Sequence, residues 1–200
     1  QLRGEYLYTA SGKKGLRVFD VASVDNKGFS ERSVTAPVSP LGQRAYVDSK
    51  DATCVALPTN MPIAMNRKHR PENKEQWPIH PIYHYAYVSD AKEGLILVNI
   101  DTLADGNPRN NFLKRTLTYN PDGLLNGARY VVNAGNYLYM SADSGLIVLN
   151  IENPKDPRVV KVFPELSGVK SIAVQFRYVF AVGTQGLQVI DITDPEKPAM

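Results

Sequence analysis

The chain has 200 residues, 43% of them hydrophobic and 22% charged, which is typical of a soluble globular protein and excludes a disordered chain. Its 23 Lys and Arg residues and 20 Asp and Glu residues are scattered, which excludes the basic stripe of a nucleic-acid-binding protein. No apolar run approaches the roughly 20 residues of a membrane-spanning helix, and a single cysteine excludes an internal disulfide, a Cys-rich metal motif and covalent haem attachment within this stretch.

The first predicted element is a strand with two aromatic side chains on one face. It begins the stretch EYLYTASGKKGLRVFD at Glu5, where Tyr6 and Tyr8 are two residues apart and therefore share a face. Three later stretches repeat this layout: HYAYVSDAKEGLILVN from His84, NYLYMSADSGLIVLN from Asn136 and RYVFAVGTQGLQVID from Arg177. We interpret the rings as a packing ladder and not as a ligand-binding array.

A glycine turn and a second strand follow each aromatic strand. The turn glycines are Gly15, Gly94, Gly145 and Gly186, as a tight hairpin with positive φ requires. The second strands read LRVFDV, LILVNI, LIVLNI and LQVIDI. These runs are nearly continuously apolar, which predicts strands that are covered on both faces.

An oxygen-bearing side chain stands five residues after each glycine, at Asp20, Asn99, Asn150 and Asp191. A ring of metal ligands is one interpretation of this recurrence. A side-chain bond to the backbone, closing the end of each strand, explains one such residue per unit more simply.

Each repeat then continues through a turn and an outer strand. The turns are rich in Pro, Asp and Asn, as in ENPKDP and TDPEKP, and the outer strands read FSERSVTA, NFLKRTLTY and PRVVKVF. A further strand, such as GARYVVNAG or VKSIAVQF, leads into the next aromatic strand, so each full unit holds four strands. The glycines are 41 residues apart from Gly145 to Gly186, 51 from Gly94 to Gly145 and 79 from Gly15 to Gly94. Four short strands at a period of about 40 predict an all-β protein, a β-propeller with four-stranded antiparallel blades.

The repeated core strand and turn resemble the LVIVD-repeat family, whose units centre on G-L-x-V-x-D-[IV] followed by D-P-x-x-P. GLQVIDITDPEKP matches nearly throughout, GLIVLNIENPKDP has Asn for Asp, GLILVNIDTLADGNP stretches the turn, and GLRVFDVASVDN lacks the prolines. The resemblance implies a propeller in an exported or surface-associated protein, and it supplies no catalytic motif.

Counting strands divides the chain into four blades at about residues 5–38, 50–120, 127–165 and 168–200. The chain is expected to enter at the second strand of the first blade and to stop after the third strand of the last. Because a propeller closes with about four blades or more, we expect an incomplete ring of about three to four blades. It would belong to a longer chain or be completed by partner segments, since an open arc leaves apolar faces in water.

The long first spacing indicates an insertion at residues 58–83, between the predicted inner strand ATCVALPTN and the second aromatic strand. We expect Cys54 to be a small buried residue of that inner strand, with a cross-link to another chain as the alternative. The insertion should leave the blade at the same end as the Pro-Asp turns. It is rich in proline, histidine and aromatic residues, and such stiff loops make good contact surfaces. The candidate partner contacts are Arg67, His69, Arg70, Trp77, His80, Tyr83 and His84.

Three functions are consistent with this sequence. The first is a non-catalytic scaffold for protein–protein contact in an exported or cell-surface assembly, extracellular or alternatively periplasmic, with no cofactor. The second is the propeller part of a multihaem electron-transfer protein with a haem-bearing partner. His80 and His84 would then be ligands only if the loop folds back, because residues four apart on a strand lie roughly 13 Å apart. The third is an enzyme that uses the axial channel, but no nucleophile-base set or phosphate loop is present.

Overall fold

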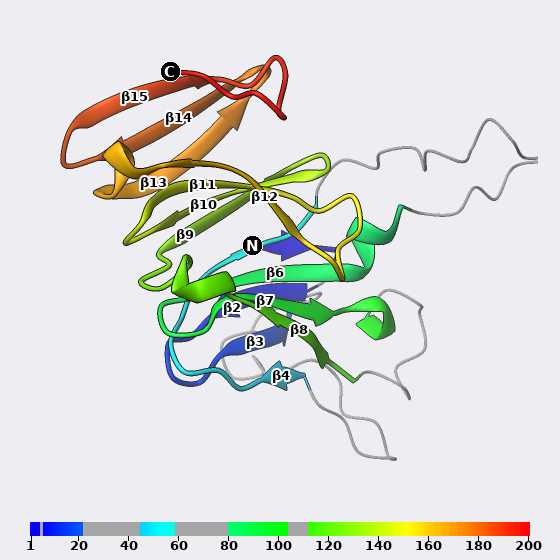
Figure 1. Cartoon of the computed structure of the whole chain (residues 1–200). Coiled ribbons are helices and arrows are strands. Elements are labelled where there is room, and N and C mark those ends of the chain that lie inside the picture. The colour runs from blue at the N-terminus through cyan, green and yellow to red at the C-terminus, as the bar shows by residue number, and fades with distance from the viewer. Residues whose placement is uncertain (5, 22–44, 59–79, 104–111) are drawn as a thin grey trace, which may run out of the picture.

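The computed structural model describes residues 1–4, 6–21, 45–58, 80–103 and 112–200. These residues form four small antiparallel sheets that follow one another as propeller blades (Figure 1), which confirms the all-β propeller predicted from the sequence. No α-helix occurs in the described ranges, and no helix there is long and apolar enough to cross a membrane.

Each sheet is built from strands that are consecutive in the chain. The first sheet contains β1 (Leu2–Arg3), β2 (Tyr6–Ala10), β3 (Leu16–Asp20) and β4 (Tyr46–Val47). The second contains β5 (Ala52–Ala56), β6 (Tyr85–Asp90), β7 (Gly94–Asn99) and β8 (Lys114–Tyr119). The third contains β9 (Tyr130–Ala134), β10 (Tyr137–Ala142), β11 (Gly145–Asn150) and β12 (Arg158–Phe163). The C-terminal sheet contains β13 (Val169–Gln175), β14 (Tyr178–Gly183) and β15 (Gly186–Asp191).

Short 3-10 helices join several of these strands. They are η2 (Pro81–His84), η3 (Asp101–Leu103), η4 (Pro121–Gly123) and η5 (Pro164–Leu166). Three of the four begin with proline, whose fixed φ suits the first position of a helical turn.

The first sheet differs from its predicted outline. The chain enters it at β1 and not at the second strand, because Leu2 and Arg3 pair with Leu7 and Tyr6. At the other edge, β4 pairs Val47 with Leu16, beyond the predicted end at residue 38. Both strands have two residues and are too short to show a hydrophobic period. The predicted outer strand at residues 29–36 lies outside the described residues.

The glycine turns bring two strands closer together than a side chain would permit. Gly145 has φ of 129°, and a Cβ atom added there would lie 2.1 Å from the carbonyl oxygen of Phe163. Glycine is therefore needed at this turn both for its backbone angles and for the approach of β12.

Each sheet has two faces, which we name front and back, and in the second and third sheets both are apolar. In the second sheet the front face carries Tyr87, Leu95 and Leu97, and it packs on the third sheet. The back face carries Val88, Ile96 and Val98, and it packs on the first sheet. The equivalent front residues are Tyr8, Leu16 and Val18 in the first sheet and Tyr139, Leu146 and Val148 in the third.

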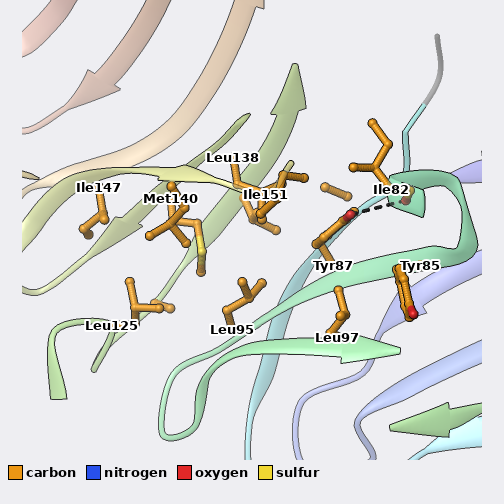
Figure 2. Packing of buried hydrophobic residues seen from close by; sticks show 14 of the residues in the cluster. Ile82, Tyr85, Tyr87, Leu95, Leu97, Leu125, Leu138, Met140, Ile147 and Ile151 are labelled. Carbon is orange, nitrogen blue, oxygen red and sulfur yellow. Dashed lines mark hydrogen bonds between the residues drawn. The ribbon is translucent and has the colours of Figure 1, made fainter. Parts of the chain in front are cut away.

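Figure 2 shows the interface between the second and third sheets. Tyr87 and Leu95 face Leu138, Met140 and Ile147 from the third sheet. The Tyr87 ring is completely buried, and its hydroxyl donates to the carbonyl oxygen of Ile82 at 3.2 Å. In the second sheet the aromatic pair therefore packs between blades, as the predicted packing ladder requires.

A buried carboxylate organises the turn between β6 and β7. Asp90 accepts hydrogen bonds from the main-chain N–H groups of Asp51 at 2.7 Å, Lys92 at 2.8 Å and Glu93 at 2.9 Å. Burial alone would raise the pKa of Asp90, but these donors favour the carboxylate and hold the pKa below its usual value. Asp90 thus ties the turn to the segment that leads into β5.

Replacing Leu97 by alanine tests the sheet-to-sheet packing. Leu97 is fully buried, so Leu97→Ala should lower the free energy of unfolding by about 2–5 kcal/mol, measured by urea denaturation. Leu2→Ala, at a position that is 64% exposed, serves as the control and should change it by less than about 0.5 kcal/mol. Equal effects of the two substitutions would contradict the stacked arrangement.

Replacing Asp90 by asparagine tests the buried cap. Because the folded-state pKa of Asp90 is lowered, its contribution to stability is present above the unfolded value of about 3.9 and is lost as the pH falls through the folded value. Asp90→Asn should therefore cost about 1–3 kcal/mol at pH 7, and this cost should shrink below about pH 4. Urea denaturation at both pH values measures it, with exposed Asp122→Asn as the control. A cost independent of pH would show that the charge is not involved.

Candidate functional site

Three of the seven predicted contact residues lie in the described part of the chain. His80 caps η2, and Tyr83 and His84 lie within it, where the insertion returns to the second sheet. The other four, Arg67, His69, Arg70 and Trp77, lie outside the described residues. The structure therefore describes the base of the predicted contact loop.

His80 is a core residue at this base. Its side chain is 4% exposed, and its Nδ1 atom accepts a hydrogen bond from the main-chain N–H of Ile82 at 3.3 Å, which caps η2. Burial lowers the pKa of His80, and the nearby Glu152 opposes this effect. A neutral imidazole is the form that can accept this bond.

Tyr83 is also buried, and it is held by the N-terminal strand. Its carbonyl oxygen accepts from Arg3 Nη1 at 2.8 Å, and the Arg3 guanidinium lies 5.9 Å from the centre of the ring. Its hydroxyl has no hydrogen-bond partner among the described residues, and burial raises its pKa. The ring therefore contributes packing at this position.

His84 points instead toward the surface. Its Nδ1 pairs with Asp101 Oδ1, and its ring meets the Tyr85 ring edge-on, with centroids 6.5 Å apart. Asp101 is held in turn by Asn99, whose Nδ2 donates to Asp101 Oδ2 at 3.1 Å. The insertion thus leaves and returns at the same end of the sheet as the turn after β7, which confirms that prediction.

The structure does not bring His80 and His84 to one ligand. The first caps η2 from inside the core, and the second is paired with Asp101 at the surface. No group of three or more His, Cys, Asp or Glu side chains that would hold a metal ion is found in the described ranges.

The oxygen-bearing residues at the strand ends serve as turn caps. Asn99 Oδ1 accepts from Asp101 N at 3.1 Å, Asn150 Oδ1 from Glu152 N at 2.9 Å and Asp191 Oδ1 from Thr193 N at 2.7 Å. The predicted side-chain bond to the backbone is therefore confirmed in three of the four repeats. The side chain of Asp20 lies outside the description.

A second candidate site, which the sequence reasoning did not assign to residues, is the front face of the C-terminal sheet. We name it the open face and define it by Tyr178, Phe180, Val182, Leu187 and Val189. Leu187 is 59% exposed and Val189 is 43% exposed. This sheet lies at one end of the stack in Figure 1. Alignment of the four copies in the sequence could have identified the residues of this face, because they occupy the positions of the aromatic pair and the Gly-Leu strand.

Polar residues also clasp the third sheet to the C-terminal sheet. The Glu196 carboxylate, in the turn after β15, accepts from Tyr137 Oη and Asn150 Nδ2, each at 2.8 Å. Both of its oxygens accept from Arg158 Nη2, at 2.9 and 3.0 Å. We name this group the turn clasp; its donors come from three strands of one sheet and its acceptor from the next.

Paired phenylalanine substitutions test whether the Tyr83 hydroxyl is a contact group or an unused one. Tyr83→Phe should leave the free energy of unfolding unchanged or raise it by up to about 1 kcal/mol, because it removes a buried group that has no partner. Tyr87→Phe should lower it by about 0.5–1.5 kcal/mol, because its hydroxyl bonds to Ile82. Thermal and urea denaturation measure both. A larger loss for Tyr83→Phe than for Tyr87→Phe would contradict the packing role.

A family model described as the LVIVD repeat matches residues 1–33, 84–115, 127–163 and 168–200. The search of curated proteins finds no match. Each matched segment contains the aromatic strand and the following Gly-Leu strand of one sheet, so the repeats of the sequence and the blades of the structure coincide. The chain belongs to the LVIVD-repeat family.

Proposed function

We propose that this propeller is a non-catalytic scaffold that binds protein partners through the insertion at residues 58–83. The observation that carries the proposal is the way in which the insertion is anchored. Its two ends are fixed in the core of a rigid frame, and functional loops are commonly held in this manner.

The anchors come from both sides of the insertion. Before it, Leu57 is 3% exposed, and its main-chain N–H donates to the side chain of Gln1 at 2.8 Å. At its C-terminal end, His80, Ile82 and Tyr83 are buried in the gap between the second and third sheets or beside it. A loop with fixed ends loses less conformational entropy when it binds.

The composition of the insertion supports protein as the ligand. It contains Trp77, Arg67 and Arg70, and tryptophan and arginine are enriched among residues that dominate binding energy at interfaces. Its prolines restrict the backbone before binding.

The non-catalytic character is supported by how the repeats use their polar side chains. Asn99, Asn150, Asp191 and Asp90 are each bonded to main-chain N–H groups in turns. These groups stabilise the ends of the sheets, which is a structural use. We propose the exported or cell-surface location from family membership, and protease treatment of intact cells, followed by detection of the cleaved chain, tests it.

Substitution in the insertion tests the binding role. The full chain is immobilised and incubated with a cell-envelope extract of the source organism, and the retained proteins are quantified by mass spectrometry. Trp77→Ala should weaken retention of a specific partner by about 30-fold, the effect of about 2 kcal/mol at an interface hot spot. Phe112→Ala, at a position 47% exposed on another segment, is the matched control. Unchanged retention by a folded Trp77→Ala variant would overturn the proposal.

A further inference from the structure

The open face repeats the residues that the other sheets bury. Leu16, Leu95 and Leu146 are at most 1% exposed, whereas Leu187 in the same position is 59% exposed. The strand register is also the same, because Leu187 pairs with Val182 as Leu146 pairs with Ser141. Val189 pairs with Phe180 as Val148 pairs with Tyr139. The open face therefore has the same kind of residues and the same strand register as the front faces that are covered in the other three sheets.

The covering surface has the same place at all three closed interfaces. It is the back face of the sheet that follows in the chain, and it is mainly apolar. Its buried residues are Val88, Ile96 and Val98 in the second sheet, Met140, Ile147 and Leu149 in the third, and Val179, Ala181 and Ile190 in the C-terminal sheet, where Gln188 takes the position of Ile96 and Ile147. In each covered interface a front face of this kind packs against a mainly apolar back face. A back face of the same kind is therefore the surface that suits the open face.

The outward face of the first sheet does not have this composition. Leu7 and Phe19 on this face are apolar, but at the positions of Val88 and Ile96 it carries Thr9 and Arg17. Arg17 pairs with Asp48 at 3.1 Å, and its guanidinium lies 4.2 Å from the centre of the Tyr46 ring. Covering this face with another sheet would remove a charged pair from water, which is costly. The first sheet of a second copy is therefore a poor cover for the open face.

The turn clasp adds a polar requirement. In the third sheet its donors are Tyr137, Asn150 and Arg158. In the C-terminal sheet the register places Tyr178, Asp191 and Ala199 at these positions. Ala199 thus stands in the position of the cation Arg158, and the carboxylate of Asp191 stands in the position of the neutral amide of Asn150. Arg177 donates to Tyr178 Oη at 2.9 Å and offsets part of the charge of Asp191.

A carboxylate such as that of Glu196 would lose the donors of Arg158 and Asn150 here and would meet Asp191 instead. We propose that the open face binds a further LVIVD-type sheet. The aliphatic back face of that sheet would cover Phe180, Leu187 and Val189, and a cationic residue in its turn would lie beside Asp191. This inference concerns a different surface from the insertion, so its failure leaves the proposed function untouched.

An extended chain tests the proposal directly. A second copy of residues 160–200 is appended after Met200, which adds 41 residues, the spacing from Gly145 to Gly186. This addition supplies the outer strand of the C-terminal sheet and one more sheet beyond it. The matched control appends residues 160–167 alone, so that it supplies the outer strand without a covering sheet.

The readout is the urea midpoint of Leu187→Ala at its original position in the two chains. With the covering sheet, Leu187→Ala should lower the midpoint as much as Leu146→Ala does in the same chain. In the control chain it should lower the midpoint by less than a quarter of that shift. Equal shifts in the two chains would overturn the proposal.

The cationic requirement has its own comparison. In the appended copy, Glu196→Arg should raise the urea midpoint of the extended chain, while Glu196→Arg at the original position should lower it by breaking the turn clasp. A lower midpoint from the appended Glu196→Arg would overturn the polar part of the proposal.

A second copy of this chain is the other possible partner of the open face. Sedimentation of the 200-residue chain at micromolar concentration tests for it. A monomer supports a further repeat as the partner. A dimer that Val189→Lys disperses and exposed Ser167→Lys leaves intact would assign the open face to a second copy and overturn the proposal.

Discussion

The second and third sheets of this protein are apolar on both faces, and this one constraint determines the rest of the structure. A sheet of this kind buries both faces only when it lies between two others, so the repeats stack front to back. The aromatic strand and the Gly-Leu strand supply both faces at once, since their side chains alternate in direction. Tyr87 and Leu95 cover the third sheet while Val88 and Ile96 cover the first. The interior of the protein consists of these gaps between blades.

The polar groups that cap turns and connect blades lie at the ends of the sheets. Asn99, Asn150 and Asp191 close strand ends, Asp90 closes a turn, and Glu196 connects neighbouring blades. Loops at these ends vary in length without disturbing the gaps, which explains how a long insertion is accommodated between β5 and β6. The protein therefore separates the packing that every repeat shares from the loops that distinguish one repeat from another.

The repeated strands and the propeller were predictable from the sequence because the period and the alternation of side chains survive in a single chain. The caps were predictable because a short oxygen-bearing side chain at a strand end has few other uses. Burial of His80 and Tyr83 was not, because it depends on how a proline-rich segment meets the third sheet and Arg3. The two-residue strands β1 and β4 were not predictable, because they are too short to show an alternation of side chains. The open face was not predictable either, because it depends on the difference in solvent exposure between equivalent positions such as Leu146 and Leu187.

The uniform front-to-back packing also has an evolutionary consequence. Because successive interfaces use corresponding positions, in-register loss or duplication of a whole unit joins a front to a back of similar shape and leaves the remaining interfaces undisturbed. Adding a unit after the last one would cover Leu187, and losing the last unit would uncover Leu146, in both cases without any point mutation. The copies differ in their loops and at the end blades, and the glycine spacings of 41, 51 and 79 residues show that loop length varies while the strands between the loops keep their layout.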